Sequence, residues 1–406
     1  MLRDISYADY KRSDDIHGAV LYPAVMVAPV QNDVLTELAD QDEINSILDP
    51  FHGSGTALYE SYLVFPNASI YGCDINPLAN LITRSKLLGV SDHIDDNIRL
   101  VETHIQDDTV TQALSFPNRN KWFREDIALS LTKIRNAIIQ VAEQRDRLFF
   151  WCMLSDVVRH YSNSRGSTYK LHIKPKSRID AMTDDAIPTF LDSANFNAVK
   201  FKEAHCPNFT LYKGDALKCL ERFRNDKVDL LITSPPYGDN DTTVPYGLFS
   251  SLALRWIDPE DLELEGWELD NYSIIDSHSL GNGHAEKTLT GYQASLLAPY
   301  INKISEEKKP KVQRFFHDYF ACLDLFTDIT DKYIVLTVGN RTVDRVKIGL
   351  VQISGDYLKQ KGFVEYQTAS REIMNKRTPP LTSMVGNAPV ESMSKEFVLI
   401  YKRPTL

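Results

Sequence analysis

The sequence has few cysteines and no long apolar run. Its 406 residues include five cysteines, which stand far apart and form no Cys-x-x-Cys pair. This spacing argues against a zinc cluster or a disulfide framework and indicates reduced thiols. No run of about 18 apolar residues exists that could span a membrane, and the polar N-terminus lacks the apolar core of a signal peptide. We therefore expect a cytoplasmic protein without a metal centre.

An excess of basic residues is also absent. The chain has 45 Lys and Arg against 55 Asp and Glu, a net charge of −10. This charge is unfavourable for a nucleic-acid partner, because phosphate contacts supply much of such affinity, and by itself it favours an enzyme of a small substrate. The charge is uneven, however, since Arg165–Arg178 holds five Lys or Arg and no acid. Overall charge therefore does not decide the partner.

The most informative stretch that is present covers residues 228–240, VDLLITSPPYGDN. The apolar run Val228–Ile232 predicts a buried parallel strand that stops at Ser234, because two adjacent prolines cannot donate to a sheet and they stiffen the backbone. The carboxyl ends of such strands are where ligands bind in open α/β sheets. A hydroxyl, unused carbonyls and an aromatic ring at this place suit a flat substrate that carries an amino group.

A glycine-rich turn follows an earlier apolar strand. Residues 46–49 predict the strand, 49–56 (DPFHGSGT) the turn, and the residues after it a helix. Glycines allow a ligand to approach the backbone closely, although a purely structural turn remains an alternative. A phosphate loop is disfavoured, because neither GxxxxGK[ST] nor GxGxxG occurs. Asp49 would stand where a cationic amine could pair with it.

Two further acids follow predicted strands. Asp74 ends the strand 69–74 about twenty residues after the glycines, which is where a carboxylate binds ribose hydroxyls in a doubly wound nucleoside site. Asp215 follows the strand at 210–213. Each acid could instead cap the helix that comes after it, at 77–86 or at 216–223. Two consecutive strand–helix units with such end residues are a stronger signal than either alone.

These motifs together resemble the amino-directed DNA methyltransferases, which methylate adenine N6 or cytosine N4. Ser234-Pro235-Pro236-Tyr237 resembles their catalytic tetrapeptide, and the initial serine resembles the cytosine-N4 branch more than the adenine branch. The turn at 49–56 resembles their S-adenosyl-L-methionine motif. The resemblance thus implies this cofactor, double-stranded DNA as partner, no membrane, and a cognate restriction endonuclease that would act separately. The cofactor-binding residues that it implies are Tyr22, Asp49, Pro50, Phe51, Gly53, Ser54, Gly55, Thr56, Asp74, Ile75, Asn76, Asp215 and Ala216.

The expected fold is α/β, a Rossmann-like methyltransferase fold with a mostly parallel sheet, helices on both faces and a largely helical insertion. The catalytic domain would comprise residues 1–90 and 201–406. Residues 91–200 would form the insertion, with two long amphipathic helices within 122–161, and would serve as a target-recognition element. Residues 241–330 are expected to be a loop-rich segment overhanging the site, an alternative target-recognition region.

Basic residues in two segments are candidates for DNA contact. Interleaved aromatic residues near the first segment suit phosphate contact and groove reading, but a solvated surface explains the same residues almost as well. The candidates are Arg165, Lys170, Lys174, Lys176, Arg371 and Lys376.

The resemblance implies a site-specific cytosine-N4 DNA methyltransferase of a restriction–modification system that flips its target base out of the duplex. The Ser234 hydroxyl and the Pro235 carbonyl would accept the amine hydrogens, and Tyr237 would stack on the base. A carbon-5 cytosine mechanism would need a nucleophilic thiolate, and no cysteine follows a proline here. The alternatives are adenine-N6 methylation, methylation of RNA or of a protein amide, and a catalytically silent DNA-binding relative.

Overall fold

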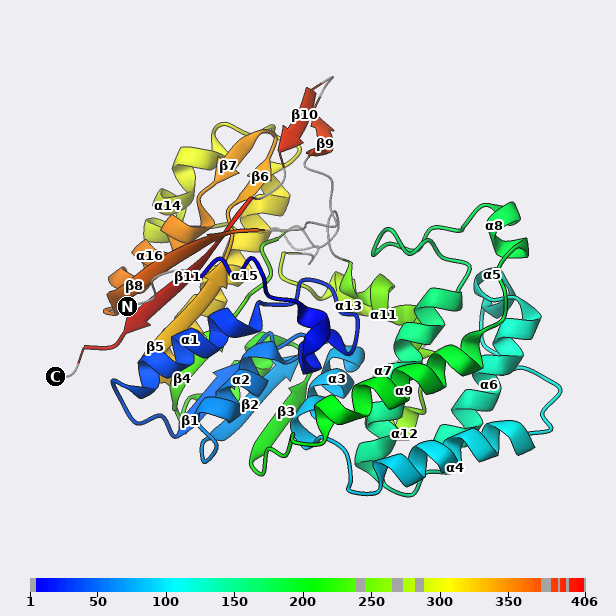
Figure 1. The fold of residues 1–406 in the computed structure, drawn as a ribbon. Helices are drawn as coiled ribbons and strands as arrows, with labels where there is room; N and C mark the ends of the chain where they lie inside the picture. Colours follow the sequence, from blue (N-terminus) through cyan, green and yellow to red (C-terminus); the bar gives the residue numbers. More distant parts are fainter. Residues whose placement is uncertain are drawn as a thin grey trace.

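A seven-stranded sheet of order β3-β2-β1-β4-β5-β11-β8 lies at the centre of the computed structural model (Figure 1). The structure describes residues 5–238, 245–264, 273–281, 288–373, 381–385, 388–391 and 394–404. Strands β3 to β5 run parallel, whereas β11 is antiparallel to both of its neighbours. The strands are β1 (Ser46–Asp49), β2 (Ser69–Asp74), β3 (Phe209–Lys213), β4 (Val228–Thr233), β5 (Thr330–Val338), β8 (Val364–Glu372) and β11 (Lys395–Lys402).

The central strands β1, β4 and β5 are mostly buried, and their alternate residues point to opposite sides of the sheet. In β4, Leu230 and Ile232 belong to one apolar core and Leu231 to the other. The first core is covered by α1 (Ala28–Ala39), α2 (Thr56–Val64) and α3 (Pro77–Leu88). The second is covered by α10 (Ala216–Leu220), α15 (Lys309–Ile329) and α16 (Leu350–Gln360). The fold is therefore Rossmann-like, as the sequence predicted.

The strand order places a crevice between β1 and β4. Strand β1 pairs with β2 on one side and with β4 on the other, and the chain leaves these strands in opposite directions across the sheet. Such a switch point leaves a crevice beyond the carboxyl ends of the two strands. Asp49 ends β1 and Ser234 follows β4, so both predicted motifs lie at this crevice.

Residues 94–201 are largely helical and pack beside the β3 edge of the sheet (Figure 1). The two long amphipathic helices predicted within 122–161 are α6 (Glu125–Ile139) and α7 (Gln144–Tyr161). Helix α7 is the core of this group, and its buried side chains join the apolar core of the sheet through α3. The others are α4 (Ile94–Asp107), α5 (Arg119–Trp122), α8 (Lys176–Asp180) and α9 (Ala186–Phe201).

The described part of 241–330 is mostly helical, whereas the sequence analysis expected a loop-rich segment. Helix α11 (Tyr246–Leu254) packs against α7, so tertiary burial stabilises it. This range also contains α12 (Pro259–Leu262), α13 (Ser273–Ser277) and α14 (Gly291–Ile301).

The remaining elements are short. They are the hairpin β6 (Arg341–Val343) with β7 (Val346–Ile348), the hairpin β9 (Leu381–Val385) with β10 (Ala388–Glu391), and the 3₁₀ turns η1 (Arg12–Asp14), η2 (Ile16–Gly18) and η3 (Glu221–Phe223). Among the described residues, no helix combines the length and the apolar character needed to cross a membrane.

Candidate functional site

A cavity of about 680 Å³ opens at the carboxyl ends of the parallel strands. Its wall brings together segments that are far apart in the sequence: residues 22–26, the turn after β1, residues 74–76 after β2, residues 214–217 after β3 and residues 234–237 after β4. Of the predicted catalytic and cofactor-binding residues, all except Asp49 and Gly55 line this cavity. The volume is within the range of pockets that bind small molecules.

The glycine-rich turn needs its glycines for conformation and for space. Gly53 and Gly55 have φ of +52° and +75°, in the left-handed region that other residues rarely adopt. A Cβ on Gly55 would lie 2.6 Å from the Thr83 side chain. The Thr83 hydroxyl donates to the Gly53 carbonyl at 3.1 Å, so α3 holds the turn from behind.

A buried lysine supports the same turn. The Lys86 ammonium donates to the Ser54 carbonyl at 2.8 Å and lies 3.5 Å from His17 Nδ1. His17 in turn contacts Glu60 at 2.8 Å through its other ring nitrogen. Burial lowers the pKa of Lys86 to about 7, because the charged form loses its hydration. Nothing in the local sequence indicates this role, since Lys86 resembles an ordinary basic residue in the last turn of a helix.

Asp49 lies behind the turn and joins β1 to β4. Its Oδ1 accepts from the Phe51 amide at 3.0 Å and from the Thr233 hydroxyl at 2.6 Å. Burial raises the pKa of Asp49 to about 7. Its Oδ2 is buried and has no hydrogen-bond partner in the described part of the chain. The side chain therefore fixes the start of the catalytic loop relative to the glycine-rich turn.

Asp74 presents its carboxylate at the cavity wall between two backbone amides. Oδ2 accepts from the Gly53 amide at 2.9 Å and Oδ1 from the Asn76 amide at 2.8 Å. Burial raises the pKa of Asp74, and the two amides partly oppose this. Asn76, not Asp74, caps α3 by accepting from the Leu78 amide. The alternative of Asp74 as the helix cap is thus wrong.

Aromatic rings close the cavity next to Asn76. The amide of Asn76 donates to the Tyr22 hydroxyl at 3.1 Å and to the Ser250 hydroxyl at 2.7 Å. The Tyr22 ring stacks on Tyr246 with ring centres 5.9 Å apart, and burial raises the pKa of Tyr22. Tyr22, a predicted cofactor-binding residue, is thereby held against α11.

Asp215 serves as a helix cap and also lines the cavity. Its Oδ1 accepts from the Leu217 amide at 2.8 Å and from the Lys218 amide at 3.3 Å, which caps α10. In the described residues no partner reaches Oδ2. The two interpretations of Asp215 are therefore compatible, since one oxygen caps the helix and the other can accept from a ligand.

The loop after β4 carries an ordered pair of hydroxyls. The Tyr237 hydroxyl donates to the Thr337 carbonyl on β5 at 3.2 Å, and Ser234 Oγ lies 3.1 Å from the same hydroxyl. A phenol has one hydrogen to donate, so the Ser234 hydroxyl is the donor of that second bond. The lone pairs of Ser234 Oγ are then left to accept from a ligand in the cavity.

The residues predicted to contact DNA are divided between two places. Arg371 lines the main cavity, where its Nε donates to Glu396 at 2.9 Å. Arg165, Lys170, Lys174 and Lys176 lie in or next to the loop between α7 and α8. Lys376 lies outside the described residues.

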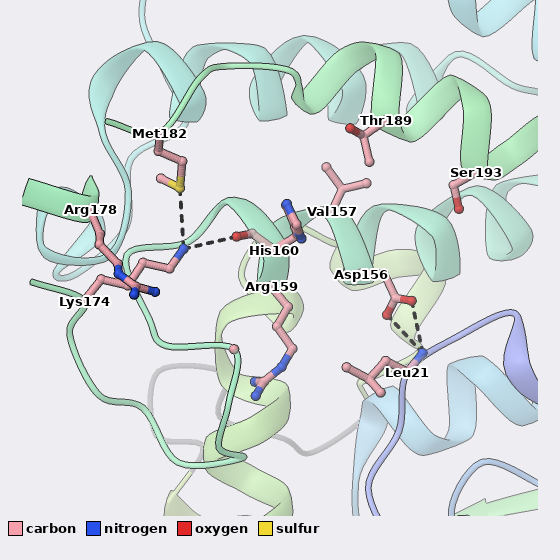
Figure 2. A pocket seen from close by; sticks show the side chains of 11 residues that line it. Leu21, Asp156, Val157, Arg159, His160, Lys174, Arg178, Met182, Thr189 and Ser193 are labelled. Carbon is pink, nitrogen blue, oxygen red and sulfur yellow. Dashed lines mark hydrogen bonds between the residues drawn. The ribbon is translucent and has the colours of Figure 1, made fainter. Parts of the chain in front are cut away.

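This basic loop borders a second cavity of about 630 Å³ (Figure 2). Lys174 points inward there and donates to the Ser162 carbonyl at 2.7 Å and to the His160 carbonyl at 3.3 Å, and burial lowers its pKa. Arg165 Nε donates to the Ile173 carbonyl at 3.3 Å. These two cations therefore contact the backbone of the loop. Arg165, Lys176 and Arg178 are exposed, whereas Lys174 is partly buried.

Several cavity residues were not predicted from the sequence. His52 is buried under the turn, with its Nε2 3.2 Å from Asn80 Oδ1, and burial lowers its pKa. Asp318 of α15 and Glu396 of β11 also line the cavity, as do Ile275 and residues 277–280 in and after α13. No local sequence signal identifies them, because only the packing of distant segments brings them to the site.

Comparison with known proteins gives one informative match. No family model matches the chain, and no solved structure matches it. The chain is 28% identical over 416 residues to the type II methyltransferase M.MvaI of Kocuria varians, and the alignment covers 95% of this chain and 90% of that protein. Over nearly its whole length, the chain is therefore similar to a type II methyltransferase.

Proposed function

We propose that the chain is an S-adenosyl-L-methionine-dependent DNA methyltransferase that methylates the exocyclic N4 amine of a flipped cytosine in duplex DNA. One observation carries this proposal: Ser234–Tyr237 and the acids Asp74 and Asp215 line a single cavity. Methyl transfer between two bound molecules requires that the pocket for the nucleoside and the pocket for the amine meet. The similarity to a type II methyltransferase supports the methyltransferase part of this proposal.

The residues at the first part of the cavity fit the cofactor. The turn at Gly53 leaves its backbone open to the cavity, the Asp74 carboxylate suits ribose hydroxyls, and the unused Asp215 oxygen suits an adenine amine. Tyr22 would line the methionine end. When bound, this cofactor supplies a methyl group on a positively charged sulfur.

The residues after β4 fit the target amine. An exocyclic amine of a base is a weak nucleophile, because its lone pair is delocalised into the ring. Ser234 Oγ and the Pro235 carbonyl oxygen would each accept a hydrogen bond from one N–H of the amine. These two bonds would localise the lone pair of the amine on its nitrogen. The Tyr237 ring would stack on the base. Positioning of the amine, with no covalent intermediate, would supply most of the acceleration.

The cysteines do not fit a carbon-5 mechanism. That chemistry requires a thiolate next to the base, and none of the five cysteines lines the cavity. All five are buried. Burial raises the pKa of Cys152 to about 12 and is also the main cause of the raised pKa values of Cys206 and Cys322.

The DNA would approach the open end of the cavity. We assign the catalytic domain to residues 1–90 and 201–406, and target recognition to the helices of 91–200, with 241–330 as the alternative region. The exposed cations of the loop before α8 would contact phosphates. A cognate endonuclease would act as a separate protein.

Tritiated methyl transfer onto unmethylated duplex DNA, followed by digestion to nucleosides, tests the proposal. We expect the label in N4-methylcytosine. Label in N6-methyladenine would select the adenine reaction, and label that appears only in RNA or protein would refute DNA as the substrate. No transfer by a protein that binds DNA would indicate a catalytically silent relative.

A further inference from the structure

Arg371 reaches the active-site edge of the sheet from a strand far along the chain. Strand β8 is antiparallel to β11, which is antiparallel to β5, so β8 runs parallel to β4 and β5. Arg371 pairs with Glu396 near the carboxyl end of β8, at the same edge where Ser234 follows β4. Three strand spacings of about 4.8 Å separate β4 from β8, roughly 14 Å in total. A base and an extended arginine side chain together span such a gap.

The guanidinium of Arg371 is held at one side and open at the other. Its Nε donates to Glu396 Oε2 at 2.9 Å, and the two side chains are only 11% and 17% exposed. Within the described part of the chain, neither Nη group has a hydrogen-bond partner. Arginine donors that are withdrawn from water need acceptors, and Arg371 lines the cavity that contains Ser234.

The acceptors that fit this arrangement are two adjacent atoms on the edge of a base. When the N4 amine of a cytosine faces Ser234, the N3 and O2 atoms follow along the same edge, and both are acceptors. The planar fork of an arginine matches two adjacent acceptors. Adenine presents N1 beside a C–H group, which would leave one donor unsatisfied.

We infer that Arg371, anchored by Glu396, is a specificity-determining residue that donates from its Nη groups to N3 and O2 of the target cytosine. This inference rests on the function proposed above and adds to it the group that recognises the base. Glu396 is a positioning residue, since it acts on the base through Arg371. The competing interpretation is that Arg371 contacts a backbone phosphate, which any cation could do.

Binding to two matched duplexes separates these interpretations. The wild-type recognition site is first mapped by methylation-sensitive sequencing. One duplex then carries the target cytosine, and the other has an abasic site at that position. Dissociation constants are measured for the full chain with S-adenosylhomocysteine present, for the wild type, Arg371→Met, Arg371→Lys and the control Arg165→Met, which alters an exposed cation of the basic loop.

We expect Arg371→Met to weaken binding of the cytosine duplex by roughly 10- to 100-fold more than binding of the abasic duplex, as for loss of a two-bond base contact. Arg371→Lys should show the same selective loss, because it keeps the charge but not the fork. Arg165→Met should affect both duplexes equally. If Arg371→Met weakens both duplexes equally or neither, or if lysine restores binding of the cytosine duplex, the inference is wrong.

Failure of the proposed function would be seen separately. A wild-type nucleoside digest without N4-methylcytosine refutes that function before any variant is made. Circular dichroism and thermal unfolding of each variant show whether it is folded, and Glu396→Gln gives an independent check should Arg371→Met fail to fold. Glu396→Gln should cause a smaller loss that is again confined to the cytosine duplex. An equal loss on both duplexes would overturn the inference in this case too.

Discussion

Replacing Lys86 by methionine should remove a pH dependence from the stability of the protein. Lys86 is 1% exposed beneath the glycine-rich turn, and burial lowers its pKa from the ordinary 10.5 to about 7. Between these two values the unfolded chain holds a proton that the folded chain has released. The contribution of Lys86 to the free energy of unfolding therefore rises with pH between about pH 7 and pH 10.5. Below about pH 7 this contribution does not change with pH.

The size of this effect follows from the position of the titration. Because the folded-state pKa is about 7, the free energy of unfolding begins to rise between about pH 6 and about pH 8. Integrated over that pH interval, the difference in bound protons between the unfolded and folded chains equals one. The free energy of unfolding therefore rises by about 1.4 kcal/mol. The wild type should gain about this much stability on going from the lower to the higher pH, and Lys86→Met should not gain it.

Other groups titrate in the same range, so the difference between the two proteins is the quantity to measure. Asp49 has its pKa raised to about 7 by burial, but it contributes equally to both proteins. His17 has its pKa lowered by burial and by Lys86, so loss of Lys86 flattens its contribution as well. Repeating the comparison in a His17→Gln background isolates Lys86. The remaining titratable groups around Lys86 are Arg12, Asp15, Glu60 and Cys152.

Urea unfolding at a series of pH values provides the assay, with Lys303→Met as the control because Lys303 is exposed. The control should follow the wild-type curve. If the unfolding free energies of the wild type and Lys86→Met change in parallel over this range, Lys86 does not titrate there and the reasoning is refuted.

Three further predictions concern the site itself. Ser234→Ala should lower methyl transfer roughly 100-fold or more while calorimetry shows cofactor affinity unchanged, and Asp74→Ala should weaken cofactor binding first; the reverse pattern would refute this division of roles. Tyr237→Phe keeps the ring but removes the acceptor of the Ser234 hydroxyl. We expect kcat to fall several-fold, in line with loss of a hydrogen bond worth about 1 kcal/mol, and cofactor affinity to stay the same. An unaltered kcat would contradict the proposed orientation of Ser234. Gly55→Ala should destabilise the protein by at least about 1–2 kcal/mol because of its positive φ and the Thr83 contact, whereas Gly166→Ala, with nothing within 4 Å of a Cβ, should have little effect in thermal unfolding.

Much of the fold was predictable because its signals are local. The apolar run of β4 with its two prolines, the glycines after β1 and the spacing of apolar residues in α6 and α7 each depend on neighbouring residues. The helices of 245–301 were missed because they are stabilised by packing against other elements. Helix α11, for example, has its apolar side covered by α7.

The site was predictable only in part for the same reason. The sequence identified Asp74, Asp215 and Ser234, because each follows a recognisable strand. It could not show that one oxygen of Asp215 caps a helix while the other remains open, or that Asn76 and not Asp74 caps α3. It also could not show that Lys174 turns inward to bind carbonyls, since an exposed and an internal lysine have the same local sequence.

The sequence by itself determined which strands end in chemically useful residues, because parallel strands in a doubly wound sheet deliver their carboxyl ends to one edge. Only the tertiary structure decided how those residues are oriented. The Thr337 carbonyl of β5 fixes the hydroxyls of Tyr237 and Ser234, Lys86 supports the glycine-rich turn from below, and Glu396 of β11 aims Arg371 into the cavity. Such contacts join residues a long way apart in the chain, so their geometry is set by packing and by no local pattern.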